Sequence, residues 1–429
     1  MATRGCNECR EADRRRTTDL SRRRFLGWSS AALASATWLP RVARAEAESS
    51  DRDVLVSIFL RGGADGLSLC VPHGDRDYYR HRPTLAVPSP EASSVHRALD
   101  LDGFFGLSPA LTQLHELYRD ASLAIVHACG QTRANRSHFA AMHLMEVGHA
   151  TPPSSLLTGW IGRHLQNTTP RSPNALLRAL GMGYGLQRSL VGAPRSAPVA
   201  DPESFDLRAP AGRRAALKES LRELYAQTSD PLATSMGTTW DTVELLQGID
   251  FSSYRSTSGP YPDSELGRAL ESSAALIKSE IGIEAIAVDT GGWDTHDEQG
   301  TQDGVLDSLL KDLGDSLGVF YRDLAKSSAR FTVVVMSEFG RNAVENGSLG
   351  TDHGYGSAMM VLGSNIRGGR VFGEWPGLAR EQLFDGQDLA VTTDYRQVLA
   401  ELLEHRFANP DPTAVFDDPS FVASPLGLV

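Results

Sequence analysis

The chain has 429 residues, of which 41% are hydrophobic and 22% are charged, and its net charge is −11. This composition is typical of a soluble globular protein, and the length allows one large domain with an insertion or two domains. Residues 1–45 hold ten arginines and four acids, so residues 46–429 carry 32 basic against 49 acidic side chains, a net charge of −17. A surface this acidic repels nucleic acid and anionic membranes, so we expect neither as a partner.

The N-terminal 45 residues have the pattern of an export signal. Three arginines (22–24) precede Phe25-Leu26, a short apolar run follows to residue 39, and the tripeptide Ala43-Arg44-Ala45 resembles a cleavage site. The paired arginines resemble the twin-arginine type of signal. We therefore expect export by the twin-arginine translocation machinery, cleavage after Ala45, and a periplasmic or secreted mature protein without stable membrane insertion. The alternative is an arginine-rich tail ahead of a buried helix.

Beyond the signal, apolar runs alternate with segments of helical periodicity. The predicted strands cover residues 54–60, 123–127, 174–180, 283–288, 331–336 and 359–363. The predicted helices cover 109–119, 137–147, 304–325 and 394–407, and a polar, proline-rich stretch runs from 73 to 102. This alternation predicts a three-layer α/β fold with a mostly parallel central sheet flanked by helices. Two helical segments without a strand between them, 206–227 and 264–278, predict a helical insertion at about 200–280.

The cysteines say little about function. Cys6 and Cys9 form a C-x-x-C within the segment that we expect to be removed, and no second pair completes a zinc site. Cys70 and Cys129 remain in the mature part, and an oxidising compartment would permit a disulfide between them. The sequence does not give the Cα separation that a disulfide requires, so we favour two buried thiols and leave the disulfide open.

Acids and histidines gather in three clusters in the last third of the chain: GGWDTH at 291–296, SEFGR at 337–341 and GTDHG at 350–354. The first two follow directly on predicted strands, and Asp65 follows the first predicted strand. The carboxyl ends of parallel strands meet at one edge of a sheet, so we expect these side chains to converge there. The candidate metal ligands are Asp65, Asp294, His296, Glu338, Asp352 and His353.

Carboxylate and imidazole ligands suit a divalent ion such as Zn, Mn, Mg or Ca, and the sequence leaves its identity and number open. Two alternatives need no metal. Asp294 could cap a turn or a helix, and Glu338 could pair with Arg341.

A second group of candidates begins the helix predicted over 137–147. Ser137 at a helix N-terminus lies among unpaired backbone N–H groups that stabilise a bound anion, and Arg136 beside it suits phosphate or sulfate. A metal next to the hydroxyl would make Ser137 a nucleophile. In the simpler alternative, Ser137 is only an N-cap and Arg136 a surface charge.

Several motifs, in this order, resemble a family of exported bacterial proteins, the domain-of-unknown-function family 1501. They are the export signal, FLRGGADG at 59–66, RSHF at 136–139 and the three acidic clusters. The family is grouped with the alkaline-phosphatase-like superfamily of phosphatases, sulfatases and phosphoglycerate mutases, which act through two metals. The resemblance implies an alkaline-phosphatase-like fold over about 54–405, Ser137 at the nucleophile position, and the six candidates as metal ligands. The sequence departs from the superfamily at Glu338-Phe339, where Asp-His is usual.

These patterns together predict an exported, metal-dependent hydrolase of phosphate or sulfate esters, in which Ser137 attacks and Arg136 stabilises the charged oxygens. The alternative from another class is an inactive superfamily member that binds a surface polymer or a partner protein. Hydrolysis of carbohydrate by paired carboxylates is a weaker third interpretation, because no matched acid and base stand out in the sequence.

Overall fold

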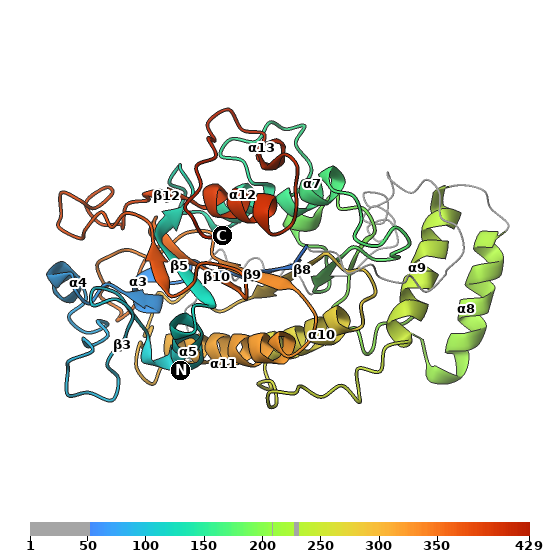
Figure 1. Ribbon diagram of the computed structural model, residues 1–429, viewed down its shortest axis with the longest axis horizontal. Helices are drawn as coiled ribbons and strands as arrows, with labels where there is room; N and C mark the ends of the chain where they lie inside the picture. Colours follow the sequence, from blue (N-terminus) through green and yellow to red (C-terminus); the bar gives the residue numbers. More distant parts are fainter. Residues whose placement is uncertain (1–51, 208, 227–230) are drawn as a thin grey trace. The chain divides into compact units, whose positions relative to one another are not determined.

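The computed structural model describes residues 52–207, 209–226 and 231–429 (Figure 1). The predicted export signal therefore lies outside the described residues. The described residues divide into two compact units. The larger comprises residues 52–201 with Phe251–Val429, and the smaller lies within Pro202–Asp250. Within the described part of the chain, no helix is both long and apolar enough to cross a membrane.

The larger unit is organised around a sheet in which nine described strands follow the order β11-β5-β10-β9-β1-β8-β6-β7, with β12 also paired to β5. The strands are β1 Val54–Leu60, β5 Leu123–Gly130, β6 Ala179–Met182, β7 Ser196–Pro198, β8 Ala285–Thr290, β9 Phe331–Met336, β10 Ser357–Gly363, β11 Arg370–Phe372 and β12 Thr393–Asp394. All pairings are parallel except those of β10, which runs antiparallel to β5 and β9. The predicted mostly parallel sheet is confirmed.

Helices cover both faces of this sheet (Figure 1). On one side lie α5 Thr112–Arg119, α10 Glu265–Lys278 and α11 Val305–Ala325, and on the other α7 Trp160–Asn167, α12 Tyr395–His405 and α13 Pro412–Val415. Because both faces are covered, central strands read as continuous apolar runs, and every residue of β1 and β9 is buried. The predicted three-layer arrangement is confirmed.

Short elements complete the larger unit. They are α3 Gly66–Leu69, α4 Arg76–His81, α6 His138–Val147, the 3-10 turns η2 Pro109–Leu111 and η3 Arg188–Leu190, and a small antiparallel sheet of β2 Cys70–Val71, β4 Gly106–Leu107 and β3 Leu99–Asp100. Cys70 and Cys129 are both buried free thiols, as favoured from the sequence.

The smaller unit contains two helices, α8 Ala211–Ala226 and α9 Pro231–Gln247. The insertion predicted at about 200–280 includes this unit and also α10. In the structure α10 belongs to the larger unit, where it packs against α11.

Two strands, β1 and β9, have the bounds predicted from their apolar runs, whereas the strand predicted at 174–180 begins only at Ala179. The reason is Arg178, whose buried guanidinium turns to Glu284, with 2.5 Å between Arg178 Nε and Glu284 Oε1. The polar stretch at 73–102 contains the short helix α4, and α7 was not predicted.

A buried carboxylate near the end of α11 joins it to α10 and to the loop after the smaller unit. Asp323 is fully buried and accepts hydrogen bonds from Lys278 Nζ at 2.6 Å, Thr257 N at 2.9 Å and the Tyr254 hydroxyl. Burial alone would raise the pKa of Asp323, but the hydrogen bonds from Lys278 and Tyr254 outweigh it and hold that pKa below its ordinary value.

We predict that Asp323→Asn lowers the free energy of unfolding by about 2 kcal/mol at pH 7, because the partners lose a charged acceptor. A lowered carboxyl pKa stabilises the fold above the unfolded value of about 4, and this contribution is lost as the pH falls through the lower folded pKa. The difference between wild type and variant in urea unfolding should therefore shrink below about pH 4. Asp315→Asn, on the exposed face of the same helix, should change stability by less than about 0.5 kcal/mol. An equal loss in both variants would contradict this.

Candidate metal centre

The predicted site residues come from segments that meet at one edge of the sheet. The strands β1, β5, β8 and β9 are mutually parallel in direction, so the loops that follow them leave at the same edge. Because β10 runs the opposite way, the loop that precedes it, with Asp352 and His353, reaches that edge too. The topology thus gathers the sequence clusters into one place.

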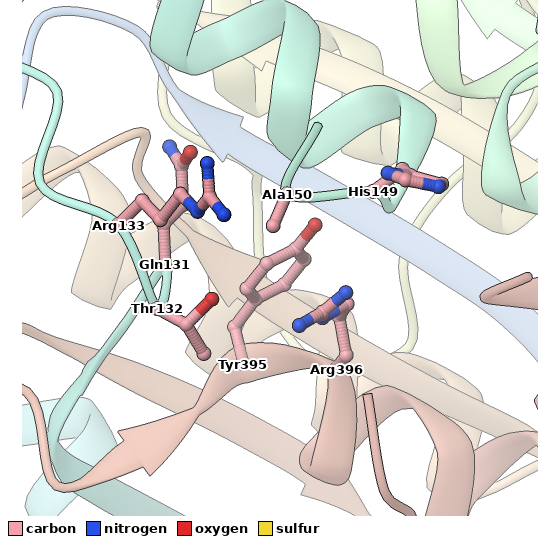
Figure 2. A pocket seen from close by; sticks show the side chains of 7 residues that line it. All are labelled: Gln131, Thr132, Arg133, His149, Ala150, Tyr395 and Arg396. Carbon is pink, nitrogen blue, oxygen red and sulfur yellow. The ribbon is translucent and has the colours of Figure 1, made fainter. Parts of the chain in front are cut away.

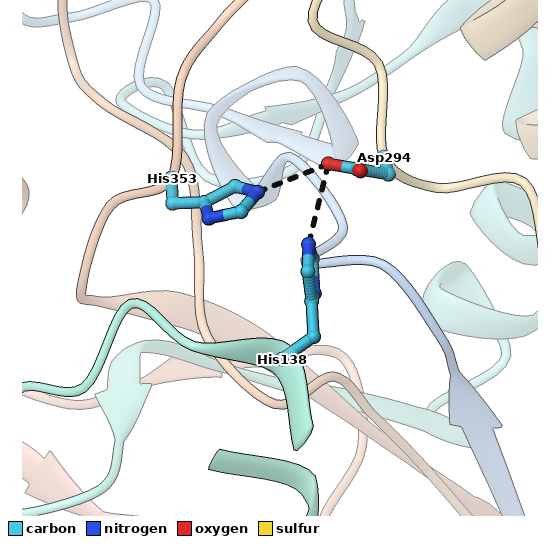
Figure 3. Close-up of side chains that lie close together, drawn as sticks. All are labelled: His138, Asp294 and His353. Atoms are coloured by element: carbon cyan, nitrogen blue, oxygen red, sulfur yellow. Dashed lines mark hydrogen bonds and ion pairs between the residues drawn. The ribbon is translucent and has the colours of Figure 1, made fainter. Parts of the chain in front are cut away.

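Asp294 lies at the centre of this gathering. Its Oδ1 atom is 3.1 Å from Nε2 of His353, 3.0 Å from Nε2 of His296 and 3.4 Å from Nε2 of His138. Figure 3 shows His138, from the start of α6, and His353 approaching the same carboxylate. Three imidazoles thus turn the same ring nitrogen toward one oxygen.

This arrangement fits a divalent cation. One ligand atom from each of His138, Asp294 and His353 lies within 4.8 Å of the others, which is the spacing of a metal-binding group. The Nε2 of His138 is buried and has no hydrogen-bond partner among the described residues, although Asp294 is near enough for an ion pair. A buried polar atom without a partner is costly, and a bound cation would satisfy it. Two imidazoles and a carboxylate are a donor set that zinc accepts.

His296 adds a third imidazole beside this group. Its Nε2 is 2.9 Å from Nε2 of His353, so only one of these two nitrogens can carry the proton between them. The other accepts that proton through its lone pair, and the loss of the proton would free both lone pairs for a cation. His296 therefore lies where a fourth ligand would be.

The charges around Asp294 shift the pKa values of the groups there. Burial alone would raise the pKa of Asp294, but the neighbouring imidazoles of His138, His296 and His353 and the charge of Arg341 hold it well below its ordinary value. Burial opposes protonation of His138, yet Asp294 and Glu338 raise its pKa to about 9. The hydrogen bond to Asp294 also raises the pKa of His296, against a smaller effect of burial. The site is a concentration of negative charge that attracts cations, protons or metal alike.

Each imidazole is held at its other nitrogen by an oxygen. Nδ1 of His138 is 2.7 Å from Oε1 of Glu338, and Nδ1 of His296 is 2.9 Å from Oδ1 of Asp352. Nδ1 of His353 is 2.8 Å from the carbonyl oxygen of Arg136. Such contacts at the outer nitrogen fix the ring and its tautomer, as is usual for metal-binding histidines.

Arg341 ties the loops of the site together. Its guanidinium is fully buried and donates to Oδ1 of Asp294 at 2.6 Å, and to backbone carbonyl oxygens of Gly62, Gly63, Trp293 and Thr351 at 2.5–3.0 Å. These acceptors belong to the loops after β1 and β8 and to the loop before β10. The alternative ion pair between Arg341 and Glu338 does not form, because the carboxylate that pairs with Arg341 is that of Asp294.

The backbones of these loops approach closely, and glycine permits it. Gly62 has φ +127°, and a Cβ atom there would lie 2.6 Å from the backbone nitrogen of Asp294. A Cβ atom on Gly350 would lie 2.0 Å from the carbonyl oxygen of His296. A larger residue at either position would push the loops around Asp294 apart.

Asp65 is not part of the group of ligand atoms around Asp294, so its predicted role as a metal ligand stays a prediction. It is fully buried in a two-point ion pair with Arg82, with Oδ2 to Nη1 at 2.5 Å and Oδ1 to Nη2 at 2.9 Å, and it also accepts from Ser68 and Gln299. Burial alone would raise the pKa of Asp65, but Arg82 outweighs it and holds that pKa below its ordinary value. A guanidinium already neutralises this carboxylate.

Glu338 also differs from its predicted role as a ligand. Both of its oxygens are engaged in the interior, Oε1 by the backbone N–H of Gly62 at 2.8 Å and by His138, and Oε2 by the hydroxyl of Ser337 at 3.1 Å. It therefore reaches the centre through His138. Phe339, which follows it, is buried and packs against the rings of His138 and His353 at centroid distances of 4.9 and 5.0 Å.

Ser137 and Arg136 lie at the entrance to α6. Ser137 is the N-cap residue, half-buried, and its hydroxyl makes no capping hydrogen bond. The guanidinium of Arg136 pairs with the fully buried Asp388 rather than pointing to an open site, with 3.1 Å between Nε and Oδ2. The contribution of Arg136 that the structure supports is its carbonyl oxygen, which holds His353.

A small cavity lies between the segment that follows β5 and the start of α12 (Figure 2). It is lined by Gln131, Thr132, Arg133, His149, Ala150, Tyr395 and Arg396. Its volume of about 10 Å³ is room for roughly one water molecule, so it is too small for an ester substrate. Gln131 connects it to the site by donating to the carbonyl oxygen of Glu338 at 2.9 Å.

The structure thus brings together Asp294, His296, Asp352 and His353 among the predicted ligands, and places Asp352 behind His296. The residue missing from the predicted ligand set is His138. The sequence contains a signal for it, because the segment with Ser137 and His138 follows β5, which ends at the same edge of the sheet.

Comparison with known proteins agrees with the family resemblance. The family described as "Protein of unknown function (DUF1501)" matches residues 216–417 of the chain. No curated protein matches the chain.

Three solved structures are similar over most of their length. Two are crystal structures of the C-terminal periplasmic domain of EcEptC from Escherichia coli. The one in complex with Zn has 10% identity, covers 76% of this chain and 78% of that chain, and gives a TM-score of 0.33. The other has 8% identity, covers 90% of this chain and 92% of that chain, and gives a TM-score of 0.37. A protein in the alkaline phosphatase superfamily from Vibrio parahaemolyticus has 10% identity, 82% and 71% coverage and a TM-score of 0.30.

We predict that Asp294→Asn weakens Zn²⁺ binding by more than the roughly 10–100-fold typical of residues that only support ligands. Asp65→Asn is the matched change at a carboxylate held by Arg82. It should leave Zn²⁺ affinity within about twofold while lowering the free energy of unfolding by about 3 kcal/mol, because a buried guanidinium loses its partner. Competition with a coloured chelator below the melting temperature of both variants measures the affinity. A comparable loss of Zn²⁺ affinity in the two variants would indicate that Asp65 is also a metal ligand.

Proposed function

We propose that this chain is an exported hydrolase of phosphate or sulfate esters that uses one divalent metal ion and the hydroxyl of Ser137. The observation that carries the proposal is the convergence of His138, Asp294 and His353, because His138 directly follows Ser137 in the chain. These three residues, with His296 beside them, would hold the ion. A divalent ion there would lower the pKa of a neighbouring hydroxyl and offset negative charge on the ester oxygens.

Ser137 is suited to the role of nucleophile. Its hydroxyl is not consumed as a helix cap, and it lies at the N-terminus of a ten-residue helix, where unpaired N–H groups favour negative charge. In the proposed reaction the Ser137 oxygen forms a bond to phosphorus or sulfur as the bond to the departing alcohol breaks. Water then hydrolyses the serine ester, which frees phosphate or sulfate and restores the hydroxyl.

One metal ion, rather than the two implied by the superfamily, is supported by what surrounds the cluster. Arg82 already neutralises Asp65, Glu338 is engaged by backbone and His138, and the side chain of Phe339 occupies the space beside the imidazoles. The second candidate function, an inactive member that binds a surface polymer or partner protein, is favoured by the same three features. If the protein binds metal but hydrolyses no ester, the second candidate function is favoured.

Substrate and export are parts of the proposal. The proposed substrate is an anionic ester, because a divalent ion held by the cluster would attract the negatively charged ester oxygens. The twin-arginine machinery would carry the folded chain out of the cytoplasm and leave a periplasmic or secreted protein cleaved after Ala45.

We predict that Ser137→Ala reduces ester turnover by at least about 1,000-fold, because the attacking atom is removed, while Zn²⁺ binding and stability change little. A panel of aryl phosphomonoesters, phosphodiesters and sulfate esters measures the turnover. Ser264→Ala is the control. Its hydroxyl caps α10 through the Gly267 N–H at 2.9 Å, so the change should cost about 1 kcal/mol of stability and no turnover. Full activity in Ser137→Ala would remove Ser137 from the mechanism.

We predict that replacing Arg22 and Arg23 together by lysine blocks export, because the twin-arginine route reads the arginine pair itself. Cell fractionation followed by immunoblotting measures the exported fraction. The same change at Arg14 and Arg15, outside the motif, should leave export intact. Unimpaired export of the first variant would contradict the assigned route.

A further inference from the structure

Glu338 is a buried carboxylate that is not part of the candidate metal-binding group. Only 1% of its surface is exposed. Oε1 accepts the backbone N–H of Gly62 at 2.8 Å and lies 2.7 Å from Nδ1 of His138, and Oε2 accepts the hydroxyl of Ser337 at 3.1 Å. These partners come from the loops after β1 and β9 and from the start of α6, so the carboxylate is held from three sides.

His138 links this carboxylate to the centre. An imidazole that donates its Nδ1 proton to a carboxylate presents Nε2 as the ligand nitrogen. That nitrogen faces Oδ1 of Asp294 at 3.4 Å, and the ring meets the ring of His353 edge-on with 4.2 Å between centroids. Nε2 of His138 is also the buried atom without a hydrogen-bond partner among the described residues.

The other two imidazoles follow the same pattern, with an oxygen behind each ring. The carbonyl oxygen of Arg136 lies behind His353 and the carboxylate of Asp352 behind His296. Glu338 differs from Asp352 in being fully enclosed, since the side chain of Asp352 is 56% exposed. Enclosure of an acid at this position strengthens its hold on the ring, because water does not compete for the hydrogen bond.

We propose that Glu338 is a positioning residue that acts through His138: it fixes the ring so that Nε2 points to the metal, and it does not bind the metal itself. This inference rests on the proposed metal site and goes beyond it by separating the ligands from their supports. Glu338 influences the metal affinity of the site through its contact with the ligand His138. Its effect therefore requires the imidazole of His138.

A double-mutant cycle of Zn²⁺ affinity tests this dependence. Glu338→Gln keeps an acceptor oxygen and the shape of the side chain, and should weaken Zn²⁺ binding about 10-fold. His138→Ala removes a ligand and should weaken binding further, by roughly 100-fold or more. If Glu338 acts through His138, the double variant binds as weakly as His138→Ala, within about twofold. If the two losses multiply instead, Glu338 contacts the metal directly and the inference is overturned.

Controls separate positioning from general support of the fold. Glu284→Gln changes another buried carboxylate, which precedes β8 at the opposite edge of the sheet and pairs with Arg178. It should lower the melting temperature and leave Zn²⁺ affinity within about twofold. An equal loss of Zn²⁺ affinity in Glu284→Gln and Glu338→Gln would reduce Glu338 to a structural residue.

A second readout follows the hydrogen bond itself. The Nδ1 proton of His138 should give a solvent-protected ring N–H resonance in ¹⁵N-histidine spectra of the Zn²⁺-loaded wild type and Glu338→Gln, and this resonance should be lost in Glu338→Ala. Its presence in Glu338→Ala would contradict the inference. If the wild type binds no Zn²⁺, the proposed function fails as well. If Zn²⁺ binds but the cycle is additive, only the role of Glu338 fails.

Discussion

The site depends on one buried cation, the guanidinium of Arg341. Five oxygens from three separate loops accept its hydrogen bonds, and one of them is the Asp294 oxygen at the centre of the histidine cluster. A planar group with five donors in a fixed arrangement can hold backbone carbonyls at set distances, which a lysine could not. The positions of the loops after β1 and β8 therefore follow from Arg341. The metal-binding geometry follows from the positions of those loops.

Topology explains why these loops meet. A fully parallel sheet would have placed the GTDHG segment at the far edge, because it precedes its strand instead of following it. The reversed direction of β10 brings Asp352 and His353 to the edge where β8 delivers Asp294. A single antiparallel strand thus completes the cluster. The close backbone approaches at Gly62 and Gly350 then allow the histidines to converge.

Much of the fold was predictable because the central strands are buried on both faces. Continuous apolar runs set the bounds of β1 and β9 without reference to the rest of the chain. The direction of β10 was not predictable in this way, since an apolar run carries no information on which way it pairs. The late start of β6 depends on the long-range pair of Arg178 with Glu284, which local periodicity does not contain.

The sequence predicts which residues lie at the candidate site better than it predicts which of them would be ligands and which would support a ligand. The sequence singles out Asp294, His296 and His353 because acids and histidines among glycines beside strands are seldom core residues. Asp65 and Glu338 have the same local sequence pattern, yet each contacts a partner that this pattern does not contain. Asp65 pairs with Arg82, 17 residues away, and Glu338 contacts His138, 200 residues away. His138 was missed because a single histidine at a helix start resembles many that have no function. The role of each acid or histidine depends on which side chains it contacts, and those contacts form only in the folded chain.

The central claim is that the histidine cluster around Asp294 holds a single divalent ion. Anomalous X-ray diffraction at the zinc absorption edge, from crystals of the chain grown with Zn²⁺, tests it most directly. The account predicts one strong anomalous peak per chain, coordinated by Nε2 of His138, Nε2 of His353 and the carboxylate of Asp294. A peak beside Asp65, or no peak within the cluster at saturating Zn²⁺, would contradict it.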